Sequence, residues 1–201
     1  MRIPKLAPTM IFGAIATIAV LGFLVAGAAL AGESDSGNAA TTNSGIARLL
    51  NKANAINYEE IQMAKMAQDK AGDNQALLTF AKTMQADHQA NEDAVTALSN
   101  QKNVKINPTP ASMRQKVEQM QNLKGAQFNG AMINAEVQDH QKALKFFEGE
   151  RGRFSSDPHV ALYVDETIPV LRAHLQMAKA LQQHMGQASN ENPENNKSVS
   201  R

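Results

Sequence analysis

The tripeptide Asp-His-Gln occurs twice in this chain, at residues 87–89 and again at residues 139–141. Imidazoles and carboxylates bind metals and exchange protons, so each copy is a candidate for chemistry. The flanking residues favour helices, because Ala, Gln, Met and Leu are abundant around both copies. Neighbouring side chains of a helix diverge by about 100°, so the His and the Asp of one copy face in different directions. The chemistry depends on which of the two faces the core.

Apolar residues that recur in alternating steps of four and three mark the core-facing seam of a helix in a bundle. His88 and His140 both fall on such a seam, and a third seam contains His174. A fourth seam contains a carboxylate, Glu60, where an apolar side chain is expected. Counted from the predicted helix starts, these residues lie about halfway along their helices. A bundle of these helices would bring them to one level.

Buried imidazoles and carboxylates cost roughly several kcal/mol unless they are paired or ligate something. Three neutral imidazoles and a carboxylate suit zinc, iron or copper, and bundles often build such sites from inward-facing side chains. We therefore predict a transition-metal site made of the four seam residues, Glu60, His88, His140 and His174. Glu136, one helical turn before His140, is an additional candidate ligand. Asp87 and Asp139 are predicted to orient imidazoles of neighbouring helices, as carboxylates often do around metals.

A purely structural interpretation of the same residues stays open. Histidines in a helical core can bond a glutamate, an asparagine such as Asn91 or a water, and so form a polar layer that fixes helix register. The sequence contains no Cys for thiol catalysis, no Gly-rich phosphate loop and no serine in a nucleophile elbow. We therefore do not expect an ordinary enzyme.

Helical apolar periodicity predicts four long helices at about residues 45–71, 74–100, 126–152 and 158–185, with a shorter helix at about 110–123. Asp73 and Asp157 are the predicted N-caps of the second and fourth long helices, and Pro158 suits the first helical position. Pro169 should kink the last helix without ending it, because the apolar pattern continues to Met185.

The connection between the second and third long helices decides the topology. It contains the short helix and an extended stretch with Pro108 and Pro110, which together can travel the length of the bundle. The two flanking helices would then run parallel, as in ferritin-like bundles. We predict an all-α, ferritin-like four-helix bundle with a short extra helix in the crossover. A simple up-and-down bundle with a packed extra helix is the alternative.

The chain begins with two basic residues, Arg2 and Lys5, followed by an apolar run over residues 10–31. The run ends in Ala-Leu-Ala, with a small residue on either side of the leucine, which predicts a signal peptide, residues 1–31, that is removed by cleavage. The alternative is an uncleaved anchor in which residues 10–31 span the membrane. Both interpretations predict export to the periplasm or cell envelope.

Small and polar residues flank the predicted bundle on both sides. They predict a flexible linker over residues 32–45, the bundle over residues 46–185 and a disordered tail over residues 186–201. The chain has 20 basic and 19 acidic side chains, without the clustered basic excess that nucleic-acid binding needs. We expect no nucleic-acid partner, and self-association into a homo-oligomer stays open.

Three ordered motifs carry a resemblance to a known family: "FAKTMQADHQAN", "LKGAQFNGAMINAEVQDHQKALKFFE" and "DETIPVLRAHLQMAKAL". They resemble a bacterial family of exported proteins of unknown function, often labelled predicted outer membrane proteins, over about residues 46–183. The resemblance implies a ferritin-like fold and brings no reaction. Di-iron members of the wider ferritin-like group carry Glu-x-x-His on two helices. Here Gln85 stands three residues before His88 and Leu171 stands three before His174, which argues against di-iron oxidase activity.

Three functional hypotheses follow from these observations. The first is an exported helical bundle that binds a transition metal at mid-height and serves metal handling or stress resistance in the cell envelope. The second is a non-catalytic scaffold or interaction module whose polar layer is structural. The third is a metal-dependent oxidase or peroxide-consuming enzyme, which requires an open coordination position on the metal.

Overall fold

The computed structural model describes residues 36–190, and over this range the chain consists of five helices and no strands. The helices are α1 (Ser36–Lys70), α2 (Gln75–Gln101), α3 (Ala111–Gln121), α4 (Gly125–Glu150) and α5 (Pro158–Asn190). The prediction of an all-α chain is confirmed. Within residues 36–190, no helix is both long enough and apolar enough to cross a membrane. The predicted signal or anchor segment, residues 1–31, lies outside the described residues.

The first and last helices of the chain, α1 and α5, extend beyond their predicted ends. α1 begins at Ser36, so residues 36–45, predicted as part of a flexible linker, are helical. Near this end the helix lies close to buried Phe154, since a Cβ added at Gly45 would lie 3.3 Å from its ring. α5 continues to Asn190, five residues into the predicted tail.

Capping residues set the ends of the helices. α1 is followed by Gly72, whose φ of 59° is the left-handed conformation that glycine adopts most easily. Asn74, and not the predicted Asp73, caps α2, because its side chain accepts a hydrogen bond from the Leu77 N–H at 3.0 Å. The predicted cap of α5 is confirmed, since Asp157 accepts from the Val160 N–H at 3.3 Å. The helix then runs on through Pro169, as predicted.

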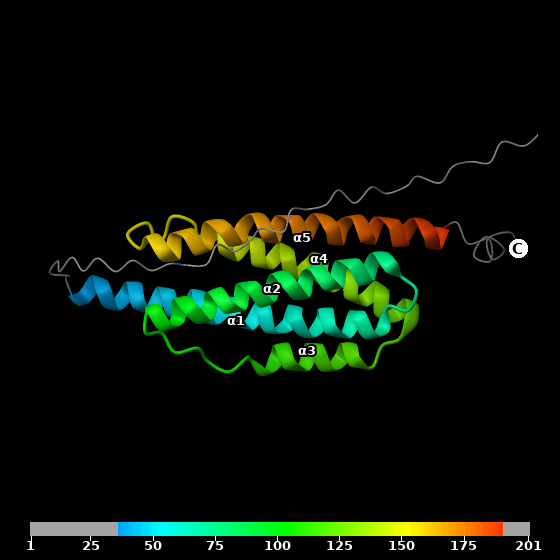
Figure 1. Cartoon of the computed structure of the whole chain (residues 1–201), viewed down its shortest axis with the longest axis horizontal. Helices are drawn as coiled ribbons and strands as arrows, with labels where there is room; N and C mark the ends of the chain where they lie inside the picture. Colours follow the sequence, from blue (N-terminus) through cyan, green and yellow to red (C-terminus); the bar gives the residue numbers. More distant parts are fainter. Residues whose placement is uncertain (1–35, 191–201) are drawn as a thin grey trace, which may run out of the picture. The chain divides into compact units, whose positions relative to one another are not determined.

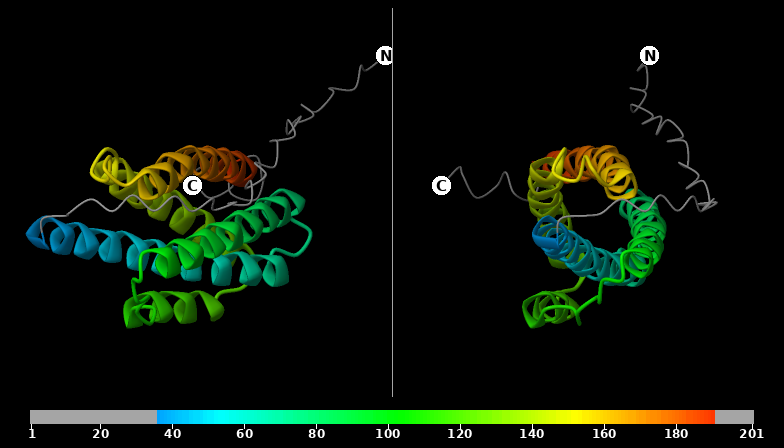
Figure 2. Two further views of the ribbon diagram at one scale, coloured as in Figure 1. Left: turned by 60° about the vertical axis from the view of Figure 1, so that its left-hand side comes forward. Right: turned by 90° about the vertical axis from the view of Figure 1, so that its left-hand side faces the viewer.

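The four long helices form a ring around one core (Figure 2). Going around the ring, α1 packs against α2, α2 against α5, α5 against α4, and α4 against α1. Neighbours in this ring are antiparallel, whereas α2 and α4 run in the same direction (Figure 1). The connection between α2 and α4 contains α3, which lies outside the ring against α1 and α4. The chain therefore travels the length of the bundle between its second and third long helices.

The core consists of two apolar clusters with a polar layer between them. The first cluster contains Met63, Phe80, Met84, Phe128, Met132 and Leu181, among others. The second contains Leu49, Leu50, Val95, Phe147, Val160 and Ile168, among others. Between the two lie buried polar side chains from all four helices of the ring, namely Asn57, Glu59, Glu60, His88, Glu136, His140, Thr167 and His174.

Candidate metal centre

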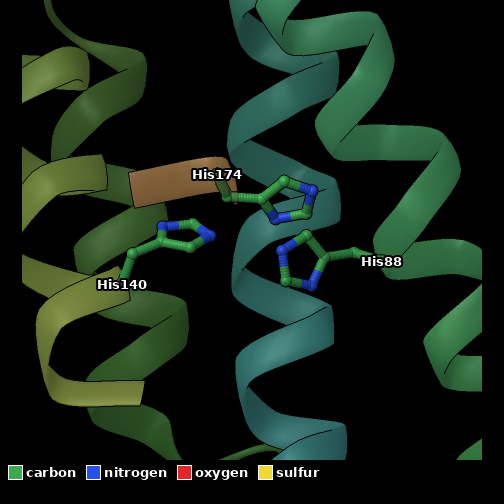
Figure 3. Close-up of side chains that lie close together, drawn as sticks. All are labelled: His88, His140 and His174. Carbon is green, nitrogen blue, oxygen red and sulfur yellow. The ribbon is translucent and has the colours of Figure 1, made fainter. Parts of the chain in front are cut away.

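Three histidines from three helices meet in the polar layer: His88 on α2, His140 on α4 and His174 on α5 (Figure 3). Each is at most 4% exposed. The ring centroids of His88 and His140 lie 5.7 Å apart, and the centroid of His174 is 5.3 Å from each of the other two. Each histidine offers one ring nitrogen, and these three nitrogens all lie within 4.8 Å of one another. This spacing fits three ligands around one ion.

One nitrogen of each imidazole is held by an acceptor outside the cluster. Nδ1 of His140 lies 3.0 Å from the backbone oxygen of Glu136. Nε2 of His174 lies 2.9 Å from a carboxylate oxygen of Asp87, and Nδ1 of His88 lies 3.0 Å from Oδ1 of Asn57. The second nitrogen of each ring is buried and has no hydrogen-bond partner. In a neutral imidazole the nitrogen that faces an acceptor carries the proton, so the other nitrogen has a free lone pair.

The orientation of Asn57 is fixed by its own contacts. Its Nδ2 donates to Oδ1 of Asn91 at 2.9 Å and to Glu92 at 3.1 Å, so its oxygen must face His88. Asn91 is fixed in turn, because the Tyr163 hydroxyl donates to its oxygen at 3.1 Å. Its amide nitrogen donates to the Thr167 hydroxyl at 3.3 Å. A network across α1, α2 and α5 thus sets the tautomer of one histidine.

Burial favours the neutral form of two of these histidines, His88 and His174. It lowers the pKa of His88 well below the ordinary value, and the adjacent His174 and His140 lower it further. Burial also lowers the pKa of His174, although the hydrogen bond to Asp87 acts in the opposite direction. The neutral imidazole is the form that ligates metals. These two side chains are therefore ready to bind a cation at neutral pH.

Two buried carboxyl groups lie on the other side of the His140 ring. An oxygen of Glu136 is 3.4 Å from Nδ1 of His140, and an oxygen of Glu60 is 3.9 Å from the same nitrogen. Burial raises the pKa of Glu136 well above its usual range, and the neighbouring Glu60 raises it further. Burial likewise raises the pKa of Glu60, although His140 opposes this. The pair therefore retains a proton more readily than exposed carboxyls do.

A cavity of about 360 Å³ between α1, α3 and α4 reaches Glu60, one member of this carboxyl pair, from outside. Its lining includes Lys52, Glu59, Glu60, Met113, Lys116 and Asp139. Lys116, on α3, contacts the carboxylates of both Glu59 on α1 and Asp139 on α4. These ion pairs fasten α3 over the groove between the two helices.

The structure does not bring all the predicted site residues together. The three histidines meet, but Glu60 pairs with Glu136 beyond the His140 ring and is not part of their cluster. Asp87 contacts a histidine of a neighbouring helix, as predicted. Asp139 contacts Lys116 and Lys142 and no histidine, because its side of α4 faces α3.

Sequence reasoning missed Asn57, which holds His88. A second seam on α1 could have revealed it, since every member of the following series is buried: Leu50, Ala53, Asn57, Glu60, Ala64 and Ala67. In that series Asn57 and Glu60 are the two polar positions, one helical turn apart.

The fold and the site together define a helical bundle with a histidine-rich polar layer in its core. The chain belongs to the family described as a domain of unknown function, DUF4142, whose match covers residues 31–181. The resemblance to a family of unknown function is thereby confirmed, and the match includes every residue of the polar layer. No curated protein and no solved structure matches the chain.

Proposed function

We propose that this protein binds one transition-metal dication through His88, His140 and His174. The observation that carries the proposal is the set of three buried imidazole nitrogens, one per histidine, that have no hydrogen-bond partner and face one another. A buried polar atom without a partner costs about 1–3 kcal/mol. A single ion would satisfy all three atoms at once.

The ligand chemistry favours a borderline metal. Neutral imidazoles suit zinc, copper and iron, and three protein ligands leave at least one further position for water or a small ligand. The ring nitrogens that face away from the cluster contact Asp87, Asn57 and the Glu136 backbone oxygen. Such contacts resemble those that orient metal-bound histidines. An open position is also what an oxidase or peroxide-consuming enzyme would need. Optical spectra of the metal-loaded protein with peroxide test that alternative.

The topology supports a ferritin-like assignment. Parallel α2 and α4, joined by a long crossover that contains α3, are the arrangement of ferritin-like bundles, which place metals between inward-facing side chains. The apolar run over residues 10–31 supports a role outside the cytoplasm. We place the protein in metal handling or stress resistance of the cell envelope.

Elemental analysis of the full chain, made without an affinity tag, tests the proposal. Wild type should retain at least one metal ion per chain after equilibration with Zn²⁺ and dialysis, and the double variant His88→Ala, His140→Ala should retain none. His184→Ala is the matched control, because His184 lies exposed on α5. Equal metal content in wild type and the double variant would sink the proposal.

The polar network around Asn57, Asn91 and Tyr163 favours a second candidate function, a scaffold whose polar layer only fixes helix register. This candidate predicts that His88→Leu folds, with equal or greater stability, and changes no ligand binding. Metal titration of that variant separates the two functions.

A further inference from the structure

We propose that a second divalent cation binds on the opposite side of His140, held by Glu60, Glu136 and Nδ1 of that histidine. The inference rests on the proposed three-histidine site, because both positions share one imidazole. Its two nitrogens point in opposite directions, Nε2 into the histidine cluster and Nδ1 towards the carboxyl groups.

The geometry provides three donors in a closed space. One ligand atom from each of the three residues lies within 4.8 Å of the others. All three residues are buried, with exposed fractions of 4% for Glu60, 2% for Glu136 and 1% for His140. One carboxylate oxygen of Glu136 is buried and has no hydrogen-bond partner, although it lies 3.4 Å from Nδ1. A buried oxygen of this kind requires a proton or a cation beside it.

The charges of the layer favour a cation at this position. The nearest basic side chain of α3, Lys116, is already engaged by Glu59 and Asp139. Two dications, one on each side of His140, would be balanced by Glu60, Glu136, Asp87 and a deprotonated His140. Binding of the second ion would displace to solvent both the Nδ1 proton and any proton that the two carboxyl groups share. The Glu136 backbone oxygen keeps its helical hydrogen bond when that proton leaves.

The donor set and the access route differ from those of the three-histidine site. Two carboxylate oxygens and one imidazole favour harder dications such as Mn²⁺, Fe²⁺ or Zn²⁺. The cavity between α1, α3 and α4 includes Glu60 in its lining but none of the histidines. An ion could therefore reach the carboxyl position from outside without passing through the histidine cluster.

Zn²⁺ titration of the metal-free full chain by calorimetry tests the stoichiometry. Wild type should bind two ions per chain, the double variant Glu60→Gln, Glu136→Gln one, and the double variant His88→Gln, His174→Gln one. Glu148→Gln, at an exposed position of α4, is the control and should bind two. Circular dichroism of each variant checks that it folds.

The outcomes separate the two proposals. One Zn²⁺ per chain in wild type and one in the Glu60→Gln, Glu136→Gln variant would overturn the second position and leave the three-histidine site intact. No Zn²⁺ in wild type would overturn both. One ion in wild type that binds more weakly in the glutamine variant would also overturn the second position, since the carboxyls would then act only as counter-charges.

Electron paramagnetic resonance with Cu²⁺ tests the shared ligand. Two Cu²⁺ ions joined through one imidazolate couple magnetically, so the signal per copper in wild type should fall below that of either double variant. A wild-type signal equal to the sum of the two single-site signals would show that His140 does not bridge the ions.

Discussion

The two Asp-His-Gln copies differ in the hydrogen bonds and ion pairs that their Asp and His side chains make. On α2, Asp87 holds His174 of α5, and His88 is held by Asn57 of α1. On α4, the aspartate binds lysines, and the histidine uses the backbone of its own helix. The same tripeptide orients a histidine in the first copy and fastens an outer helix in the second.

Helix geometry explains the difference. In both copies the histidine lies in the core seam, and the aspartate lies about 100° around the helix axis. On α2 that direction meets α5, which belongs to the ring. On α4 it meets α3, which lies outside the ring. The role of a side chain next to a core position is therefore set by which helix lies beside it.

The largest expected effect distinguishes the two aspartates directly. Asp87→Asn should lower the Zn²⁺ affinity about 10- to 100-fold, because it removes the charged acceptor that orients His174. Asp139→Asn should leave the affinity within about twofold, because Asp139 contacts no histidine. Competition with a chelator measures both. An equal loss in the two variants would contradict the contrast between the copies.

Acid sensitivity should come from His88. Its pKa is lowered well below 6.5 in the folded protein, so the unfolded chain binds more protons below that pH. The free energy of unfolding of the metal-free protein should therefore fall as the pH decreases below 6.5. His88→Gln should reduce this slope by up to about 1.4 kcal/mol per pH unit. Urea denaturation at several pH values measures the slope, which the exposed-site variant His184→Gln should not change.

A substitution at Lys116 tests the role of Asp139 in the second Asp-His-Gln copy. Lys116→Met should lower the free energy of unfolding by about 1 kcal/mol, because Glu59 and Asp139 lose a shared cation that is partly exposed to solvent. Hydrogen exchange should also quicken in α3. Lys142→Met is the control, since Lys142 contacts the same aspartate but its side chain is 72% exposed. A similar loss in both variants would show that α3 is not fastened by Lys116.

The smallest expected effect tests the network behind the first copy. Tyr163→Phe removes the hydroxyl that donates to Asn91 and should lower the free energy of unfolding by about 0.5–1 kcal/mol. Tyr58→Phe, on half-buried Tyr58 of α1, provides the comparison. Chemical denaturation measures both, and a larger loss at Tyr58 would argue against the network.

The sequence predicted the helices and the height of the site along the bundle. It predicted less well which groups each site residue contacts. Steps of four and three locate core positions, and the fixed rise per residue locates their height, so the meeting of three histidines could be anticipated. Height does not determine which side of a neighbouring ring a group occupies. Glu60 lies in the same layer as the histidines, yet it faces the opposite side of His140.

The remaining differences arise from packing. α1 contacts α2, α3 and α4, so its buried face is wide and contains more than one apolar stripe. A single stripe through Ile56 passes beside Asn57, which is 2% exposed. The start of α1 was missed because Ser, Gly, Asn and Thr, which are frequent in residues 36–45, have weak helix propensity.

The histidines of the layer are far apart along the chain, and a metal held by all three would act as a cross-link. It would close two loops, residues 88–140 and residues 140–174, in a sequence that contains no cysteine. Closing loops of this length with disulfides removes chain entropy worth about 4 kcal/mol each. The resistance of the bundle to unfolding would then rise with the concentration of free metal, so the protein would last longest where its metal is plentiful.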